Sequence, residues 1–242
     1  MRLTRNHIDA PLAEGMSLVL PENTTAHLTR VLRLAVGARF VLFNGDGCDY
    51  EAQLLSLAKK GAEAQVLSRR EVQNESSLRI TLAQAVARGE KMDLILQKAT
   101  ELGVTGFAPL LTERTEVKLD AERGDKRLAH WRGVVASACE QSGRARIPSV
   151  APPLPLANFL TQKAMGRVIH FDPDADASLR DVPPDETDLA LVIGPEGGLG
   201  ERDLAQLRSA GALGVRLGPR ILRTETAGLA ALAAVQALRG DL

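Results

Sequence analysis

One stretch near the C-terminus decides how the rest of this sequence is interpreted: Leu217-Gly218-Pro219-Arg220-Ile221-Leu222-Arg223-Thr224-Glu225-Thr226-Ala227. A Gly-Pro loop normally ends a regular element, because proline lacks an N–H and glycine tolerates positive φ. Here the loop leads through two arginines, a glutamate and two threonines into an alanine-rich segment of helical character. Taken alone, the stretch is equally typical of an ordinary strand-to-helix connection with a solvated ion pair.

A second glycine loop, Gly194-Pro195-Glu196-Gly197-Gly198, follows the apolar run 188–193. Ligands of open α/β sheets bind outside the carboxyl ends of the strands. Three loops leave predicted strands at that edge, at residues 112–114, 194–198 and 218–226. Glycines let backbone groups approach a ligand closely, so the two glycine loops predict a single shared binding site.

The 242 residues suit one large domain or two smaller ones, and the pattern changes at a polar linker near residue 73. Before it, short strands separated by close turns indicate a small β-barrel or rolled sheet; after it, strands alternating with helices indicate a mostly parallel sheet covered on both faces. We therefore expect domains at 1–72 and 73–242. The expected strands are 17–20, 39–43, 50–57, 63–70, 78–86, 104–111, 167–171, 188–193 and 214–217, and the expected helices are 22–34, 92–102, 125–141, 201–209 and 226–239.

Bulk composition limits the possible partners and the compartment. The formal net charge is zero, so a nucleic-acid partner would need a local basic patch. Aromatic residues make up only 3%, which disfavours a base-stacking platform. The two cysteines, Cys48 and Cys139, are expected to be free thiols in a reducing compartment. No segment approaches the ~20 apolar residues of a membrane span, so a cytoplasmic protein is expected.

Several common catalytic motifs are missing. The sequence has no G-x-x-x-x-G-K-[ST] phosphate loop and no G-x-S-x-G nucleophile elbow. Gly197-Gly198-Leu199-Gly200 does not complete a G-x-G-x-x-G dinucleotide fingerprint, and it comes late in the sheet. The four histidines do not cluster in sequence, so no metal site is expected.

The last predicted helix has no visible solvent face. Between Ala227 and Leu238 only Gln236 is clearly polar. A helix that is apolar all round must be covered on nearly every side. Burial within one lobe would satisfy this requirement, and so would pairing with a second subunit.

Both glycine loops and several further strings resemble one family. The further strings are Arg88-Gly89-Glu90-Lys91-Met92, Gln97-Lys98-Ala99-Thr100-Glu101-Leu102-Gly103, Ala138-Cys139-Glu140-Gln141-Ser142-Gly143-Arg144 and His27-Leu28-Thr29-Arg30-Val31-Leu32-Arg33. Together they resemble the RsmE family of 16S ribosomal RNA uridine N3-methyltransferases, within the SPOUT class. The similarity covers nearly the whole chain, and the string from Arg220 to Ala227 is highly specific.

The resemblance implies a fold, a cofactor and partners. The C-terminal domain would be an α/β trefoil knot, and the N-terminal one a PUA-like β-barrel that binds RNA. The methyl donor would be S-adenosyl-L-methionine, and the enzyme a homodimer. Its substrate would be a uridine in the decoding region of 16S rRNA, either free or in the assembled small ribosomal subunit.

Methylation of uridine N3 requires a group that removes the N3 proton and one that stabilises the resulting negative charge. Arg223 and Glu225 are the first candidates, followed by Glu196, Glu113 and Arg114. Glu225 lies near the N-terminus of the final helix, where the dipole favours a carboxylate and so weakens it as a base. A positional or cofactor-facing role therefore stays open. The expected cofactor-binding residues are Leu110, Thr112, Gly194, Pro195, Gly198, Leu217, Gly218, Ile221, Leu222 and Thr224, and the expected RNA-binding residues are Arg2, Arg5, Arg30, Arg33 and Lys91.

Two alternatives remain at this stage. A knot-fold enzyme could instead methylate the ribose 2′-oxygen, but such relatives carry a Ser-Leu-Asn string where this chain has Ile221-Leu222-Arg223. That difference favours base methylation. The other alternative is a ribosome-assembly factor that binds RNA without catalysis and without the cofactor.

Overall fold

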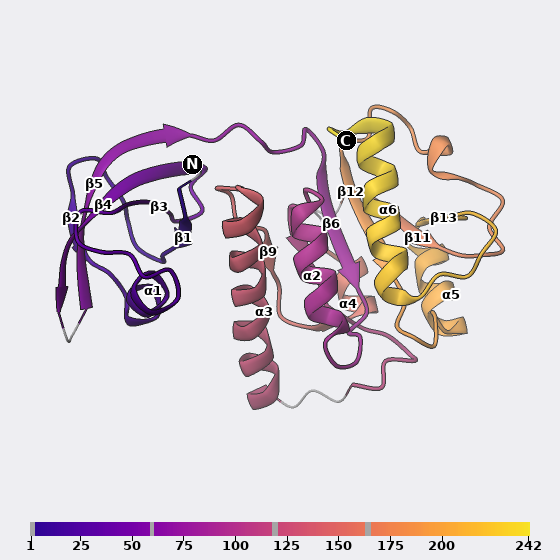
Figure 1. The fold of residues 1–242 in the computed structure, drawn as a ribbon. Coiled ribbons are helices and arrows are strands. Elements are labelled where there is room, and N and C mark those ends of the chain that lie inside the picture. The colour runs from indigo at the N-terminus through magenta and orange to yellow at the C-terminus, as the bar shows by residue number, and fades with distance from the viewer. Residues whose placement is uncertain (1–2, 59–60, 118–120, 163–165) are drawn as a thin grey trace. The chain divides into compact units, whose positions relative to one another are not determined.

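The structure is a computed structural model that describes residues 3–58, 61–117, 121–162 and 166–242 (Figure 1). Arg2, Lys59 and Lys60 lie outside the described residues. The chain divides into two compact units. The first contains Met1–Glu75 and Ala136–Ile147, and the second contains Ser76–Val135 and Pro148–Leu242.

The first unit is built on a five-stranded sheet with the order β1-β3-β4-β5-β2. β1 pairs with β3 in parallel, and the other pairs are antiparallel. The turn Asn44-Gly45-Asp46-Gly47 connects β3 and β4, with positive φ at Gly45 and Gly47. The strands are β1 (Arg5–His7), β2 (Ser17–Val19), β3 (Arg39–Phe43), β4 (Cys48–Ala58) and β5 (Gly61–Glu71).

The predicted helix at 22–34 begins as expected but changes form. α1 covers Glu22–Ala26, and a π-helical turn continues over His27–Val31. Arg33 then takes the left-handed conformation with φ +54, which is uncommon outside glycine. Leu28 is fully buried in the core of this unit.

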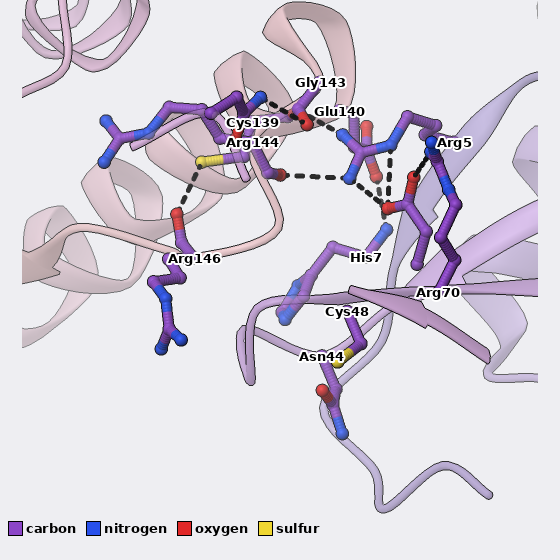
Figure 2. Close-up of polar contacts among 12 residues, drawn as sticks. Arg5, His7, Asn44, Cys48, Arg70, Cys139, Glu140, Gly143, Arg144 and Arg146 are labelled. Atoms are coloured by element: carbon purple, nitrogen blue, oxygen red, sulfur yellow. Dashed lines mark hydrogen bonds and ion pairs between the residues drawn. The ribbon is translucent and has the colours of Figure 1, made fainter. Parts of the chain in front are cut away.

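Within the first unit, a buried guanidinium on β1 contacts the segment 136–147 (Figure 2). Arg5 is 7% exposed and forms an ion pair of 2.5 Å with Asp49. Its Nη1 donates to the carbonyl oxygen of Cys139 at 2.7 Å, and its Nη2 donates to that of Arg144 at 3.1 Å. The guanidinium carbon also lies 4.4 Å from the ring centre of Phe43. Arg5 therefore stabilises the unit from inside, because its donors are directed at protein groups.

The second unit contains a six-stranded, fully parallel sheet with the order β13-β11-β12-β6-β7-β9. This confirms the mixed α/β fold with a parallel sheet. The strands are β6 (Arg79–Gln84), β7 (Gly106–Phe107), β9 (Ser149–Val150), β11 (Arg167–Phe171), β12 (Asp188–Ile193) and β13 (Leu213–Val215).

Helices cover both faces of this sheet. α2 (Lys91–Glu101) and α6 (Thr224–Arg239) pack together. α6 lies so close to the strands that a Cβ on Gly228 would be 3.5 Å from the Leu82 and Ile193 side chains. The opposite face packs Ala190 and Val192 against residues of α4 (Leu156–Leu160) and α5 (Glu201–Ser209). The long helix α3 spans Ala121–Ser142.

Several elements differ from the sequence-based expectations. The strand expected at 104–111 is split into β7 and β8 (Leu110–Leu111), because Pro109 between them has no N–H for a ladder. β8 pairs with the short strand β10 (Leu154–Pro155). The strands β1, β9 and β10, the helix α4 and a 3-10 turn at Leu179–Asp181 were not predicted. None of the helices among the described residues combines the length and apolar composition needed to cross a bilayer.

Candidate active site

A cavity of about 430 Å³ lies in the second unit at the carboxyl ends of β11 and β12 and beside the loop that follows β13. Its size falls in the range of small-molecule and cofactor sites. The lining residues are Lys91, Phe171, Asp172, Pro173, Ile193, Gly194, Pro195, Glu196, Gly198, Leu199, Leu217, Gly218, Arg220, Ile221, Leu222, Arg223, Thr224, Glu225 and Ala227. The two glycine loops predicted from the sequence therefore face one cavity.

Glycine is required in the first loop for steric reasons. A Cβ on Gly194 would lie 2.9 Å from the backbone nitrogen of Leu199 and 3.0 Å from the carbonyl carbon of Gly198. Such contacts are closer than packed atoms tolerate, so the loop can fold back on itself only without that side chain. Gly198 and Gly218 have φ values of +72 and +77, which favour glycine.

Three charged side chains meet in the cavity. The Lys91 ammonium lies 3.2 Å from Oε1 of Glu196 and 3.5 Å from Oε2 of Glu225. Oε2 of Glu225 is buried and has no hydrogen-bond partner among the described residues. The carboxylate also lies in the first turn of α6, where the helix dipole stabilises negative charge. A buried carboxylate oxygen without a hydrogen bond is suited to accept one from a ligand.

Glu196 is held in its ionised form. Burial alone would raise the pKa of this carboxyl group. The backbone N–H groups of Arg88 and of Glu196 itself, together with the Lys91 ammonium, outweigh burial and hold the pKa below its ordinary value of 4.5. The site therefore keeps this negative charge through the neutral pH range.

The loop at 112–116 supports the site from outside the cavity. Nη1 of Arg114 donates to the carbonyl oxygen of Gly197 at 2.8 Å. The backbone N–H of Glu113 donates to Asp203, and the Glu113 carboxylate accepts from the N–H of Arg202 at 3.0 Å. These contacts fix the first glycine loop to the start of α5.

The structure brings together most of the predicted site residues. Eight of the ten predicted cofactor-binding residues and three of the five catalytic candidates line the cavity. The predicted site residues outside the lining are Leu110, Thr112, Glu113 and Arg114. Leu110 is fully buried in the core, and Thr112 is hydrogen-bonded to Thr115. Arg114 does not line the cavity; it contacts the glycine loop 194–198 through the carbonyl oxygen of Gly197.

The expected RNA-binding residues are spread over both units. Lys91 lines the cavity, while Arg30 and Arg33 are exposed in the first unit. Arg5 is engaged in the buried ion pair with Asp49 described above, which leaves little of its side chain for a phosphate. Arg2 lies outside the described residues.

Sequence reasoning missed the contribution of β11. Phe171, Asp172 and Pro173 line the cavity at the end of this strand. The strand itself was predicted, and the rule that ligands bind beyond the carboxyl ends of parallel strands would have found these residues. Among the described residues there is no group of three or more His, Cys, Asp or Glu side chains that could hold a metal ion.

Comparisons with known proteins agree with this arrangement. The sequence matches the RNA methyltransferase domain family over residues 74–236 and the RNA methyltransferase PUA domain family over residues 20–67. It is 31% identical to the ribosomal RNA small subunit methyltransferase E of Buchnera aphidicola, and the match covers 100% of this chain and 98% of the relative.

Two solved structures are similar over their whole length. A Legionella pneumophila protein solved with bound SAM is 39% identical, with a TM-score of 0.95 and 100% of both chains covered. The ribosomal RNA small subunit methyltransferase E of Neisseria gonorrhoeae, bound to S-adenosyl methionine, is 40% identical, with a TM-score of 0.92 and the same coverage. This chain therefore belongs to the RNA methyltransferase family, among the proteins named ribosomal RNA small subunit methyltransferase E.

Proposed function

We propose that this protein methylates N3 of a specific uridine in 16S rRNA, with S-adenosyl-L-methionine as the methyl donor. The observation that supports this most directly is the cavity between the two glycine loops, where a buried carboxylate oxygen of Glu225 has no hydrogen-bond partner among the described residues. Relatives named for ribosomal RNA methylation, and one solved with this cofactor, support the same reaction.

The residues present fit the cofactor. Leu217, Leu222 and Ile193 supply apolar surface, and Gly218 has open space where a side chain would stand. Backbone groups of both glycine loops are available for the polar edges of a nucleoside and an amino acid. When bound, the cofactor supplies an electrophilic methyl group on a sulfonium sulfur. Leu110 and Thr112 support the site from the core and the neighbouring loop.

The chemistry at uridine needs a proton acceptor, because N3 carries a proton at neutral pH. Glu225 is our first candidate, since its buried Oε2 can accept a hydrogen bond. Lys91, at 3.5 Å, keeps a positive charge next to this carboxylate. Arg223 lines the same cavity and is exposed, so its guanidinium can stabilise negative charge that develops on O2 and O4 of the base.

We further propose the domain roles that the family resemblance implies. Residues 1–72 would be a PUA-like β-barrel that grips RNA through the exposed Arg30 and Arg33, and residues 73–242 would form a trefoil-knot methyltransferase domain. The active form would be a homodimer that works in the cytoplasm on 16S rRNA or on the assembled small subunit. The match to a PUA family and the parallel sheet support this assignment.

Two measurements test the proposed function. Calorimetric titration with S-adenosylmethionine should show binding at one site per chain, and absence of binding would favour a non-catalytic assembly factor. Mass mapping of small-subunit rRNA from a deletion strain should show the loss of one methyl group on a uridine base. Loss of a ribose methyl group instead would assign the enzyme to the 2′-oxygen class.

A further inference from the structure

A buried glutamine connects the two glycine loops without lining the cavity. Gln84 is the last residue of β6 and is 0% exposed. Its Nε2 donates to Oγ1 of Thr224 at 2.9 Å and to the carbonyl oxygen of Ala85 at 3.0 Å. Oγ1 of Thr224 in turn donates to the carbonyl oxygen of Gly194 at 2.6 Å. The contacts form a relay from the sheet to the start of α6 and on to the first glycine loop.

The direction of each hydrogen bond is fixed by the chemistry of its partner. The single hydroxyl proton of Thr224 is used on the Gly194 carbonyl, so Oγ1 can only accept from Gln84. The Ala85 carbonyl can also only accept. Gln84 must therefore present its NH₂ group to both partners, and a side chain without these donors would break the relay.

Burying the Gln84 side chain carries a cost in stability. The Oε1 atom of Gln84 is buried and has no hydrogen-bond partner among the described residues. A buried, unsatisfied polar atom costs about 1–3 kcal/mol. An apolar side chain of similar length would avoid the unsatisfied oxygen, but it would leave the Ala85 carbonyl and Thr224 Oγ1 without this donor. The NH₂ group is therefore the part of Gln84 that the surrounding structure uses.

The position of the relay suggests its purpose. Thr224 stands between Arg223 and Glu225, and all three line the cavity. Gly194 begins the opposite loop, directly after Ile193, which pairs in register with Gln84. Gln84 is therefore close to both loops. The hydrogen bonds from Gln84 to Thr224 and from Thr224 to Gly194 set the spacing between the Gly194 carbonyl and the first turn of α6.

We propose that Gln84 is a positioning residue for methyl transfer: through Thr224, it holds the Arg223–Glu225 segment in register with the glycine loop at 194–198. This inference rests on the proposed function, because it assigns the purpose of the relay to that reaction. Small displacements of groups in an active site can cost a factor of about 100 in rate, so the relay is expected to affect turnover more than RNA affinity.

Two variants remove the relay and a third preserves it. Gln84→Met and Thr224→Val delete the donor or the hydroxyl with little change in shape, whereas Thr224→Ser keeps the hydroxyl. The matched control is Gln236→Met. Gln236 is also 0% exposed and contacts the other end of α6, where it bonds Ser76 and Leu102 away from the cavity.

In the full-length protein, kcat should fall by about 10- to 100-fold in Gln84→Met and Thr224→Val, with KM for RNA changed by less than about threefold. The double variant should be no worse than either single variant, because both remove the same relay. Thr224→Ser should restore turnover. Gln236→Met should lower the melting temperature but leave kcat and the affinity for S-adenosylmethionine unchanged.

A ligand-free measurement separates this inference from the proposed function. Hydrogen exchange of the free protein should become faster in residues 194–200 and 217–227 in Gln84→Met, and not in Gln236→Met. If the wild-type protein fails to bind S-adenosylmethionine while Gln84→Met still shows this faster exchange, the proposed function would be refuted, but the hydrogen-bonded relay would still be shown to hold the two loops. Unchanged exchange and unchanged kcat in Gln84→Met, with only a lower melting temperature, would overturn the positioning role.

Discussion

Arg223 lines the cavity with an exposed guanidinium, and among the described residues no side-chain hydrogen bond or ion pair holds it. The side chain is therefore free to meet a substrate. We expect Arg223→Ala to lower kcat by roughly 10²–10³, the typical cost of losing one group that stabilises developing charge. The affinity for S-adenosylmethionine, measured by calorimetry, should stay the same.

Arg180→Ala serves as the control for Arg223→Ala, because Arg180 is an exposed arginine of the same unit that does not line the cavity. It should leave both kcat and cofactor affinity unchanged. If Arg223→Ala turns over at the wild-type rate, Arg223 has no catalytic role. Arg220, which lines the same cavity, would then be the next candidate.

Lys91 helps to keep the Glu196 carboxylate ionised, and this role predicts a pH dependence of stability. The pKa of Glu196 lies below its ordinary value of 4.5, against the opposing effect of burial, partly because of Lys91. A lowered pKa in the folded state stabilises the protein fully above the unfolded-state value, and this contribution disappears as the pH falls through the folded-state pKa.

Lys91→Met should therefore destabilise the protein most above pH 4.5, and its melting temperature should approach that of the wild type as the solution is acidified through that range. Lys91→Arg keeps the positive charge and should follow the wild-type curve. Melting curves that stay a constant interval apart at all pH values would contradict this electrostatic role and indicate a loss of packing alone.

At the level of elements, the loop at 194–198 depends on a tight return of the backbone. Gly194→Ala would place a Cβ 2.9 Å from the Leu199 nitrogen, a clash with the loop's own backbone. We expect a loss of roughly 1–3 kcal/mol in stability, as for other overpacked sites. Binding of S-adenosylmethionine should be lost as well, because the loop carries backbone groups that face the cavity.

A glycine elsewhere supplies the matched control. Gly133 lies within α3, and a Cβ there would meet no atom within 4 Å. Gly133→Ala should stabilise the protein by roughly 0.5–1 kcal/mol, since alanine is the better helix former. Thermal melting of the two variants should therefore shift in opposite directions. A stabilised Gly194→Ala protein that still binds the cofactor would show that the loop can open without cost.

The sequence predicted the elements whose pattern is local. The apolar run of β12 leads directly into its glycine loop, and α6 begins after the second glycine loop, much as expected. Elements that depend on distant partners were missed. β1 reads as Arg-Asn-His, and its burial depends on Asp49, Cys139 and Arg144, which are remote in sequence.

The candidate site shows the same division. The glycine loops were predicted because glycine and proline mark special backbone geometry in any sequence. Gln84 carries no such mark: within its strand it looks like any polar position, and its importance comes from a hydrogen bond to Thr224, 140 positions further along the chain. Hydrogen-bond partners of this kind are fixed by topology, which no local pattern encodes.

At the level of the whole molecule, α6 is more exposed than its composition would suggest. Ala231, Leu232 and Val235 are buried. Leu238 is 48% exposed, and Ala237 is exposed beside it. An apolar helix side left open within the described residues supports the proposed homodimer, because a second subunit would cover it.

A charged residue on this side should therefore weaken association. We expect the wild-type protein to sediment as a dimer, and Leu238→Lys to shift the equilibrium toward monomer, because a lysine ammonium is costly to bury in an apolar interface. The melting temperature of the variant should then be lower and should depend less on protein concentration than that of the wild type, because a monomer unfolds without dissociating. Leu55→Lys is the control: Leu55 is 39% exposed but lies in β4 of the other unit, and its substitution should leave sedimentation unchanged. A wild-type protein that sediments as a monomer at every concentration would contradict the homodimer, and the open side of α6 would then need a different partner.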